Sequence, residues 1–200
     1  KKKIIKKKKS RDHTENLLIK NIQAVKIYNK KKKIIKIYGK KNLDPINITV
    51  PGDPSSAAFF AALTILNDKS SIKIKNIGLN PTRIGFYLLL KKYKAKIKFE
   101  NLKKINNEIR GDILVESSKI KPIKASEEFY VNSTDEYPIL FIIAALTKGV
   151  SIFRGIKDLA NKESNRIYEM QKILKQLKVR SVASENEIKI FGKGKFDASN

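Results

Sequence analysis

The feature that most constrains this chain is an internal repeat, because two segments show the same order of elements. Each copy contains an apolar helix, a strand, an amphipathic helix and two more strands. The first copy predicts these elements, in that order, over residues 54–66, 71–77, 80–90, 95–99 and 112–116. The second copy predicts them over residues 135–146, 151–156, 162–177, 179–183 and 187–191. Arg83 and Arg166 stand at matching places, 83 residues apart. The repeat therefore predicts an α/β protein in which helices of both copies pack together inside.

A break in the pattern at Val50-Pro51-Gly52-Asp53-Pro54 marks the expected domain boundary. Asp53 is a suitable N-cap and Pro54 suits the first helical position, so the first helix of the repeat should start there. Its residues from 57 to 63 are apolar nearly all round, which predicts burial on every side. Before the boundary, the pattern predicts a helix from Asp12 to Lys20, followed by β-strands over residues 24–28, 33–38 and 46–50.

The last long helix of the repeat is expected to open with charged residues. Lys162 and Arg166 are four residues apart and Glu163 and Arg166 are three apart, so a helix from Lys162 places all three in its first turn. The positive end of the helix dipole and unpaired backbone N–H groups lie at the same end. Such a cluster could hold an anion and also transfer a proton. Taken alone, this cluster is better explained as a solvated helix start with one ion pair. The motifs found elsewhere in the chain, described below, favour the anion site instead.

The charge of the chain suggests a second class of function, nucleic-acid binding. The formal net charge is +25, and basic chains bind phosphate backbones by releasing counterions. Only 6 of the 44 basic residues are arginine, however, and the lysines are spread over nearly every segment beside 30 Ile and 16 Asn. Because Lys, Ile and Asn are encoded by A/T-rich codons, drift in base composition explains the excess. We therefore expect no specific nucleic-acid partner.

Cysteine is absent, which excludes disulfides, thiolate metal sites and cysteine nucleophiles. The longest purely apolar run, from Ile139 to Leu146, is far shorter than the roughly 20 residues that a membrane-spanning helix needs. We therefore expect a cytoplasmic protein without a membrane segment. The chain opens with Lys1 rather than Met, which favours an internal piece of a longer protein.

Five motifs follow one another along the chain: Ser10-Arg11-Asp12-His13-Thr14-Glu15, Pro51-Gly52-Asp53-Pro54-Ser55-Ser56-Ala57-Ala58-Phe59, Asn80-Pro81-Thr82-Arg83, Asp135-Glu136-Tyr137-Pro138-Ile139-Leu140 and Lys162-Glu163-Ser164-Asn165-Arg166. Each motif is weak alone. Together, at compatible spacing, they resemble the 5-enolpyruvylshikimate-3-phosphate synthase family over nearly the whole chain. One position departs from that family: Asn165 stands where the family usually has Asp, and we expect Asn to keep the hydrogen bonds.

The resemblance implies a two-lobed enolpyruvyl transferase fold with three βαβαββ units in each lobe, of which this chain holds a part. Residues 1–50 would end the first lobe, and residues 51–200 would form two of the three units of the second. The family transfers the enolpyruvyl group of phosphoenolpyruvate to shikimate 3-phosphate and releases phosphate, in the shikimate pathway of aromatic amino acid and chorismate biosynthesis. It uses neither a metal nor an organic cofactor. We expect a monomer whose partners are these two small-molecule substrates.

The resemblance also implies roles for single residues. Asp135 matches the aspartate that takes the proton from the 5-hydroxyl of shikimate 3-phosphate, a step that suits a carboxylate in a cleft. Lys162 matches a lysine that contacts the substrates and takes part in proton transfer. Glu163 matches the glutamate that protonates the methylene carbon of phosphoenolpyruvate. Arg166 matches an arginine that binds phosphoenolpyruvate through its planar fork.

Residues in the first motif match positions of the shikimate phosphate pocket. There the hydroxyl of Ser10 and the guanidinium of Arg11 would both donate to phosphate oxygens. His13 is as readily a structural polar residue near a helix start as a catalytic one. We expect mainly structural roles for three residues of the second and third motifs, Ser55, Ser56 and Arg83.

Two other hypotheses remain open. The related enolpyruvyl transferases that act on a UDP-sugar share the fold, although the motifs at Asp135 and Lys162 favour the shikimate enzyme. A basic nucleic-acid-binding module is the alternative from another class. Several phosphate-binding residues of the family have no counterpart in the chain, so we expect this chain alone to be inactive.

Overall fold

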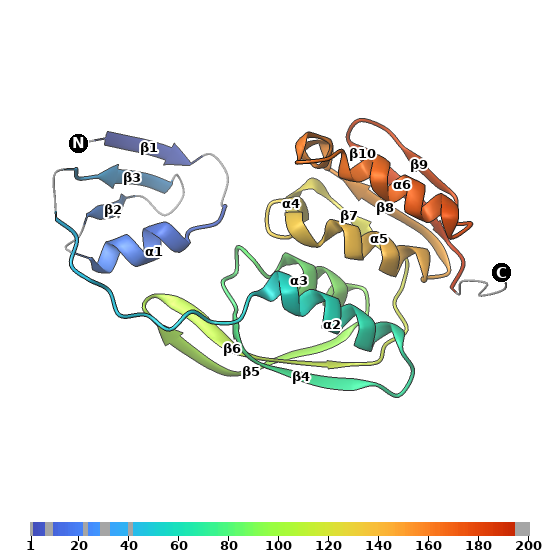
Figure 1. Cartoon of the computed structure of the whole chain (residues 1–200), viewed down its shortest axis with the longest axis horizontal. Coiled ribbons are helices and arrows are strands. Elements are labelled where there is room, and N and C mark those ends of the chain that lie inside the picture. The colour runs from blue at the N-terminus through green and yellow to red at the C-terminus, as the bar shows by residue number, and fades with distance from the viewer. Residues whose placement is uncertain (1, 7–9, 22–23, 29–32, 40–41, 195–200) are drawn as a thin grey trace.

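A computed structural model describes residues 2–6, 10–21, 24–28, 33–39 and 42–194 of the chain. An N-terminal lobe (residues 2–39) is joined by an extended connection to a larger repeat region (residues 52–192), as Figure 1 shows. The elements of the N-terminal lobe are β1 (Lys2–Lys6), α1 (His13–Lys20), β2 (Val25–Tyr28) and β3 (Lys33–Ile37). Its strands form an antiparallel sheet in the order β1-β3-β2.

The predictions for the N-terminal lobe are partly confirmed. Helix α1 follows Asp12, and two of the three predicted strands form as β2 and β3. The strand predicted over residues 46–50 is wrong, because this exposed segment pairs with no strand in the described part of the chain. An alternating pattern does not form a strand without a partner that takes up its backbone hydrogen bonds. Strand β1 was not predicted, since a Lys-rich start gives little sign of a sheet.

The repeat region contains both predicted copies, but the helix predicted over residues 80–90 begins later, at Gly85. The first copy consists of α2 (Pro54–Leu66), β4 (Ser71–Gly78), α3 (Gly85–Lys92), β5 (Lys96–Ile105) and β6 (Glu108–Glu116). The second consists of β7 (Lys124–Ala125), α4 (Glu127–Tyr130), the 3-10 turn η1 (Thr134–Glu136), α5 (Tyr137–Ala145), β8 (Gly149–Arg154), the 3-10 turn η2 (Lys157–Asn161), α6 (Arg166–Gln176), β9 (Ser181–Ala183) and β10 (Glu187–Gly192). Helix α2 starts as predicted, with the Asp53 carboxylate accepting from the Ser56 N–H.

The two copies have the same strand topology. The first sheet has the order β4-β6-β5, and β8-β10-β9 repeats that order in the second. Strand β7 adds to β8 in parallel, and at the matching place of the first copy Gly52 forms a parallel bridge with Ile77. Each copy is therefore a βαβαββ unit, in which the first strand of the first copy is reduced to one bridge. The predicted α/β fold of repeated units is confirmed.

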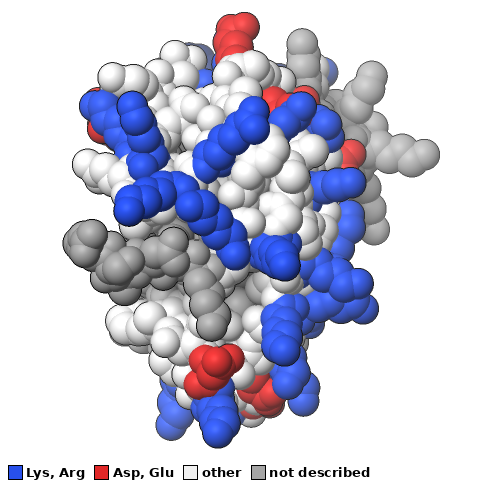
Figure 2. Space-filling view, turned by 90° about the vertical axis from the view of Figure 1, so that its right-hand side faces the viewer, with Lys and Arg blue, Asp and Glu red and all other residues white. Residues whose placement is uncertain are grey.

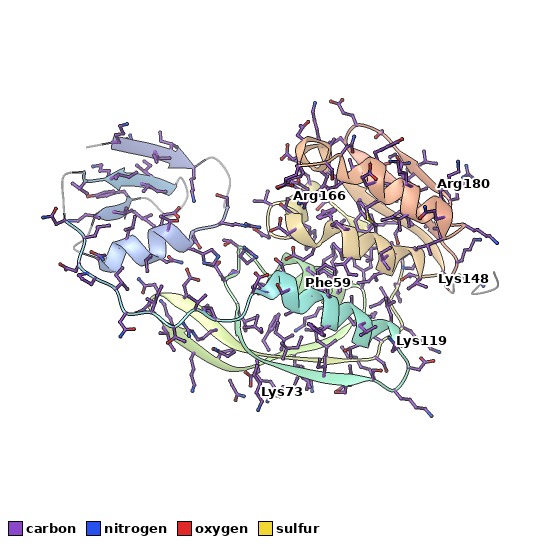
Figure 3. All side chains as sticks on the ribbon, in the orientation of Figure 1. Phe59, Lys73, Lys119, Lys148, Arg166 and Arg180 are labelled. Carbon is purple, nitrogen blue, oxygen red and sulfur yellow. The ribbon has the colours of Figure 1, made fainter. Side chains whose placement is uncertain are left out.

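Helices α2 and α5 pack against each other between the two sheets (Figure 1). Small side chains allow this approach: Ala57, Ala58, Ala61 and Ala62 on α2 are all buried. On the other side of α2, three large apolar side chains are exposed, by 61% for Phe59, 58% for Phe60 and 62% for Leu63. The prediction that α2 is buried on every side is therefore wrong. Phe59 is labelled on this helix in Figure 3.

Basic side chains are spread over the surface of the repeat region. In Figure 2 the Lys and Arg residues cover much of the face shown, with Asp and Glu side chains among them. None of the helices within the described ranges has the length and apolar character needed to cross a bilayer.

Candidate active site

The predicted base, Asp135, lies in the turn η1 directly before α5 and pairs with Arg11 across the two lobes. Arg11 Nη2 donates a hydrogen bond to Asp135 Oδ2, and both side chains are partly exposed. Partial burial works against ionisation of Asp135. The hydrogen bond and charge of Arg11, together with the charges of Arg83 and Lys162, nevertheless hold its pKa below the ordinary value. Asp135 is therefore an ionised acceptor at neutral pH, with three cations near it.

Helix α6 begins later than predicted, at Arg166 instead of Lys162. Asn165 is its N-cap, because the side-chain oxygen accepts a hydrogen bond from the Tyr168 N–H at 3.0 Å. The prediction that three charges share the first helical turn is therefore wrong, since Lys162 and Glu163 lie in the loop before α6. The expectation that Asn165 keeps a hydrogen bond is confirmed.

Glu163 and Arg166 still form an ion pair across this helix start. Arg166 Nη2 lies 3.1 Å from Glu163 Oε2, and the Glu163 side chain is largely exposed. The hydrogen bond from its own backbone N–H, followed by the charge of Arg166, lowers the pKa of Glu163 below its ordinary value. In this arrangement Glu163 is a carboxylate and thus a proton acceptor. An anion that pairs with Arg166 would weaken one of the causes that lower this pKa.

Tyr130, at the end of α4, links the surroundings of Asp135 and Arg166. Burial and then the charge of Asp158 raise the pKa of Tyr130 to about 12, while Arg166 opposes the rise and Asp135 adds to it. Both groups therefore act on the same phenol. Arg166 also lies at the end of α6 nearer the N-terminal lobe (Figure 3). The second copy thus brings two of the predicted site residues to one neighbourhood.

The residues that precede and begin α1 contact the repeat region. Ser10 is half-buried in the segment next to Arg11. His13 Nδ1 lies 3.1 Å from Glu108 Oε1. Asn80 Nδ2 donates to Asp12 Oδ1 at 2.8 Å and to Glu108 Oε2 at 2.9 Å. His13 thus belongs to a polar contact that fastens α1 to the repeat region, which supports its structural role.

Three residues near Asp135 were assigned no chemical role from the sequence. Ser55 Oγ donates to Glu136 Oε1, and Arg83 Nη2 donates to Ser55 Oγ at 2.8 Å. Burial raises the pKa of Glu136 above its ordinary value. Only the adjacency of Glu136 to Asp135 was visible in the sequence. Ser55 is 81 residues from Glu136, so their contact depends on tertiary structure alone.

One cavity of the repeat region contains none of the predicted site residues. This cavity of about 670 Å³ lies near the ends of α2 and α5 that are remote from Asp135, and four lysines line it: Lys94, Lys96, Lys119 and Lys148. Among the described residues, no three His, Cys, Asp or Glu side chains gather closely enough to hold a metal ion.

Comparison with known proteins places this site in a family. The family model described as EPSP synthase (3-phosphoshikimate 1-carboxyvinyltransferase) matches residues 2–199. The 3-phosphoshikimate 1-carboxyvinyltransferase of Aquifex aeolicus is 39% identical over 92% of this chain and 43% of its own length. That of Petrotoga mobilis is 38% identical over 96% of the chain and 44% of its own length. The chain thus spans less than half the length of these relatives.

Solved structures agree. An EPSP synthase from Acinetobacter baumannii superposes with a TM-score of 0.84 at 34% identity, over 96% of this chain and 43% of its own. The enolpyruvyl transferase NikO from Streptomyces tendae superposes with a TM-score of 0.62 over 84% of this chain and 37% of its own. At 13% identity, NikO shows a shared fold only. On sequence and on structure, the chain belongs to the EPSP synthase family.

Proposed function

We propose that the full-length protein containing this chain transfers the enolpyruvyl group of phosphoenolpyruvate to shikimate 3-phosphate and releases phosphate. The observation that carries this proposal is the Arg11–Asp135 contact, which joins a cation of one lobe to an ionised carboxylate of the other. Both proposed substrates are anions, and an arginine fork is well suited to phosphate or carboxylate. The relatives that bear this activity in their names are more than twice as long as the chain, so the activity is proposed for the whole protein.

Arg11 and Asp135 would bind and activate shikimate 3-phosphate. Ser10 and Arg11 would donate to its phosphate group, so that the substrate takes Arg11 away from Asp135. The freed carboxylate then accepts the proton of the 5-hydroxyl as that oxygen attacks phosphoenolpyruvate. Loss of the Arg11 contact also raises the proton affinity of Asp135, since the pairing with Arg11 lowers its pKa.

Arg166, Glu163 and Lys162 would act on phosphoenolpyruvate. When the carboxylate or phosphate of phosphoenolpyruvate takes up Arg166, Glu163 loses one of the partners that lower its pKa, and its proton affinity rises. It can then carry a proton and deliver it to the methylene carbon. Lys162 would contact both substrates from the loop before α6. No step in this scheme requires the three charges to share a helical turn.

We further propose that residues 1–50 end the first lobe of the whole protein and that residues 51–200 are two of three units of the second. The exposed apolar face of α2 supports this proposal, because Phe59, Phe60 and Leu63 form a surface that a third unit would bury. We also propose that the whole protein is a monomer in the cytoplasm. The absence of cysteine from this chain is compatible with a reducing compartment.

A phosphate-release assay of the full-length protein tests the function. Purified enzyme receives phosphoenolpyruvate with either shikimate 3-phosphate or UDP-N-acetylglucosamine as the acceptor. We expect phosphate release with shikimate 3-phosphate only. Release that depends on the UDP-sugar instead would assign the protein to the other enolpyruvyl transferases.

A further inference from the structure

Beside the proposed base lies a second carboxylate that no step above uses. Glu136 is only 4% exposed, and its Oε1 accepts a hydrogen bond from Ser55 Oγ. Ser55 belongs to the first turn of α2, whereas Glu136 immediately precedes α5. The bond therefore ties together the starts of the two central helices. A carboxylate this deeply buried costs free energy unless it has such partners.

Arg83 completes this link. Its Nη2 donates to Ser55 Oγ at 2.8 Å and to Asp53 Oδ1 at 2.8 Å, and the side chain is only 16% exposed. Asp53 is held in turn by the N–H of Ser56 at the start of α2. The guanidinium is thus fixed by two hydrogen bonds, and its charge acts on Glu136 and on Asp135 alike.

We propose that Glu136 is a positioning residue for Asp135. Held by Ser55, whose hydroxyl accepts in turn from Arg83, it fixes the turn that carries Asp135 and keeps a second negative charge beside it, which makes Asp135 a stronger proton acceptor. This inference rests on the proposed role of Asp135 as the base.

The ionisation of the two neighbours supports the proposal. Burial raises the pKa of Glu136; the hydrogen bond from Ser55, a backbone hydrogen bond and the charge of Arg83 oppose this rise, and the charge of Asp135 adds a smaller increase. The pKa of Asp135 is lowered, so Asp135 loses its proton first and Glu136 second. Once both are ionised, a proton returns to Asp135 more easily than it would beside a neutral group. The other charged side chains that act on this pair are Arg11, Arg83 and Lys162, and the pair acts in turn on the buried phenols of Tyr87 and Tyr130.

The competing explanation is that Glu136 only joins two helices, and three variants separate the two. Glu136→Gln keeps the acceptor oxygen and the shape but removes the charge. Ser55→Ala breaks the link, and Ser55→Thr restores a hydroxyl. Ser56→Ala is the matched control, because Ser56 is in the same helical turn and its hydroxyl donates to Asp53 at 3.0 Å, on the solvent side of the link. Thermal unfolding of each variant checks that it is folded.

The first experiment needs no activity. Carbon-13 NMR of the side-chain carboxyl of Asp135 is followed as a function of pH in the 200-residue chain. In the wild type we expect two steps, one below the ordinary range for aspartate and one that coincides with the titration of Glu136. In Glu136→Gln the second step should vanish, whereas Ser56→Ala should keep both. A single step in the wild type, or an unchanged curve in Glu136→Gln, overturns the proposal.

The second experiment measures kcat and KM against pH in the full-length enzyme. We expect Glu136→Gln to lower kcat at neutral pH by roughly 10-fold, well below the roughly 100- to 10,000-fold typical of losing a general base. The acidic side of the variant's kcat–pH profile should move to lower pH, while its KM stays within a factor of about two of the wild-type value. Ser55→Ala should lower kcat as well, and Ser55→Thr should restore it. An active wild type whose Glu136→Gln variant keeps both kcat and the acidic side of the kcat–pH profile refutes the inference. A wild type that does not use shikimate 3-phosphate refutes the proposed function instead, and the NMR result stands independently of it.

Discussion

The substitution Phe59→Ala should have different effects on the stability of this chain and of the whole protein. Phe59 lies on the open face of α2 and is 61% exposed, so less than half of its surface is buried in the chain. Complete burial of a Phe side chain contributes about 1.5–3 kcal/mol, so its truncation should cost about 1 kcal/mol here. If a third unit covers α2 in the whole protein, the same substitution opens a cavity and should cost about 3–5 kcal/mol.

Phe141→Ala is the matched control. Phe141 is fully buried, and its ring centroid lies 5.1 Å from that of Phe153 and 5.9 Å from that of Tyr137. Its truncation should cost about 3–5 kcal/mol in both forms of the protein, because Phe141 is already fully buried in the chain.

Urea unfolding of the chain and of the full-length protein, with each variant beside its wild type, provides the measurement. We expect a difference of about 2–4 kcal/mol between the two costs of Phe59→Ala, and none for Phe141→Ala. The same small cost of Phe59→Ala in both forms would refute the proposal that a third unit covers this face.

Three further predictions concern chemistry, packing and charge. In the full-length enzyme, Asp135→Ala and Glu163→Ala should chiefly lower kcat, by roughly 100- to 10,000-fold, whereas Arg166→Ala should chiefly raise KM for phosphoenolpyruvate. Steady-state kinetics of the three variants provide the measurement. If Asp135→Ala changes only KM, Asp135 is not the base. Gly192→Ala should destabilise the chain by at least about 1–3 kcal/mol in thermal unfolding, because a Cβ there would meet a backbone oxygen 2.0 Å away. Gly39→Ala, with open space around it, should leave stability unchanged. Titration with labelled DNA should show weak binding that falls steeply with salt, and tight binding to one sequence at about physiological ionic strength would favour a nucleic-acid module instead.

Local chemistry allowed most of the fold to be predicted. Asp53 and Pro54 determine where α2 starts, and the structure agrees to the residue. The order of elements in the repeat was equally visible, because apolar periodicity and turn residues recur in both copies. The matching order of the strands β4-β6-β5 and β8-β10-β9 confirms it.

The errors have both local and tertiary causes. The spacing of Lys162, Glu163 and Arg166 suggested a helix from Lys162, but the side chain of Asn165 caps the helix, which begins at Arg166. Residues 46–50 alternate like a strand and have no partner among the described strands. For the site, the motifs identified Asp135 and Arg11, whereas the link from Glu136 to Ser55 and Arg83 joins residues far apart in the chain and leaves no local pattern.

The most direct test of the account is a crystal structure of the full-length protein with shikimate 3-phosphate bound. The account predicts that the phosphate group contacts Ser10 and Arg11 and that the 5-hydroxyl oxygen lies within hydrogen-bond distance of the Asp135 carboxylate, at roughly 2.6–3.2 Å. A substrate whose 5-hydroxyl faces away from Asp135, with Arg11 still paired to that carboxylate, would contradict it.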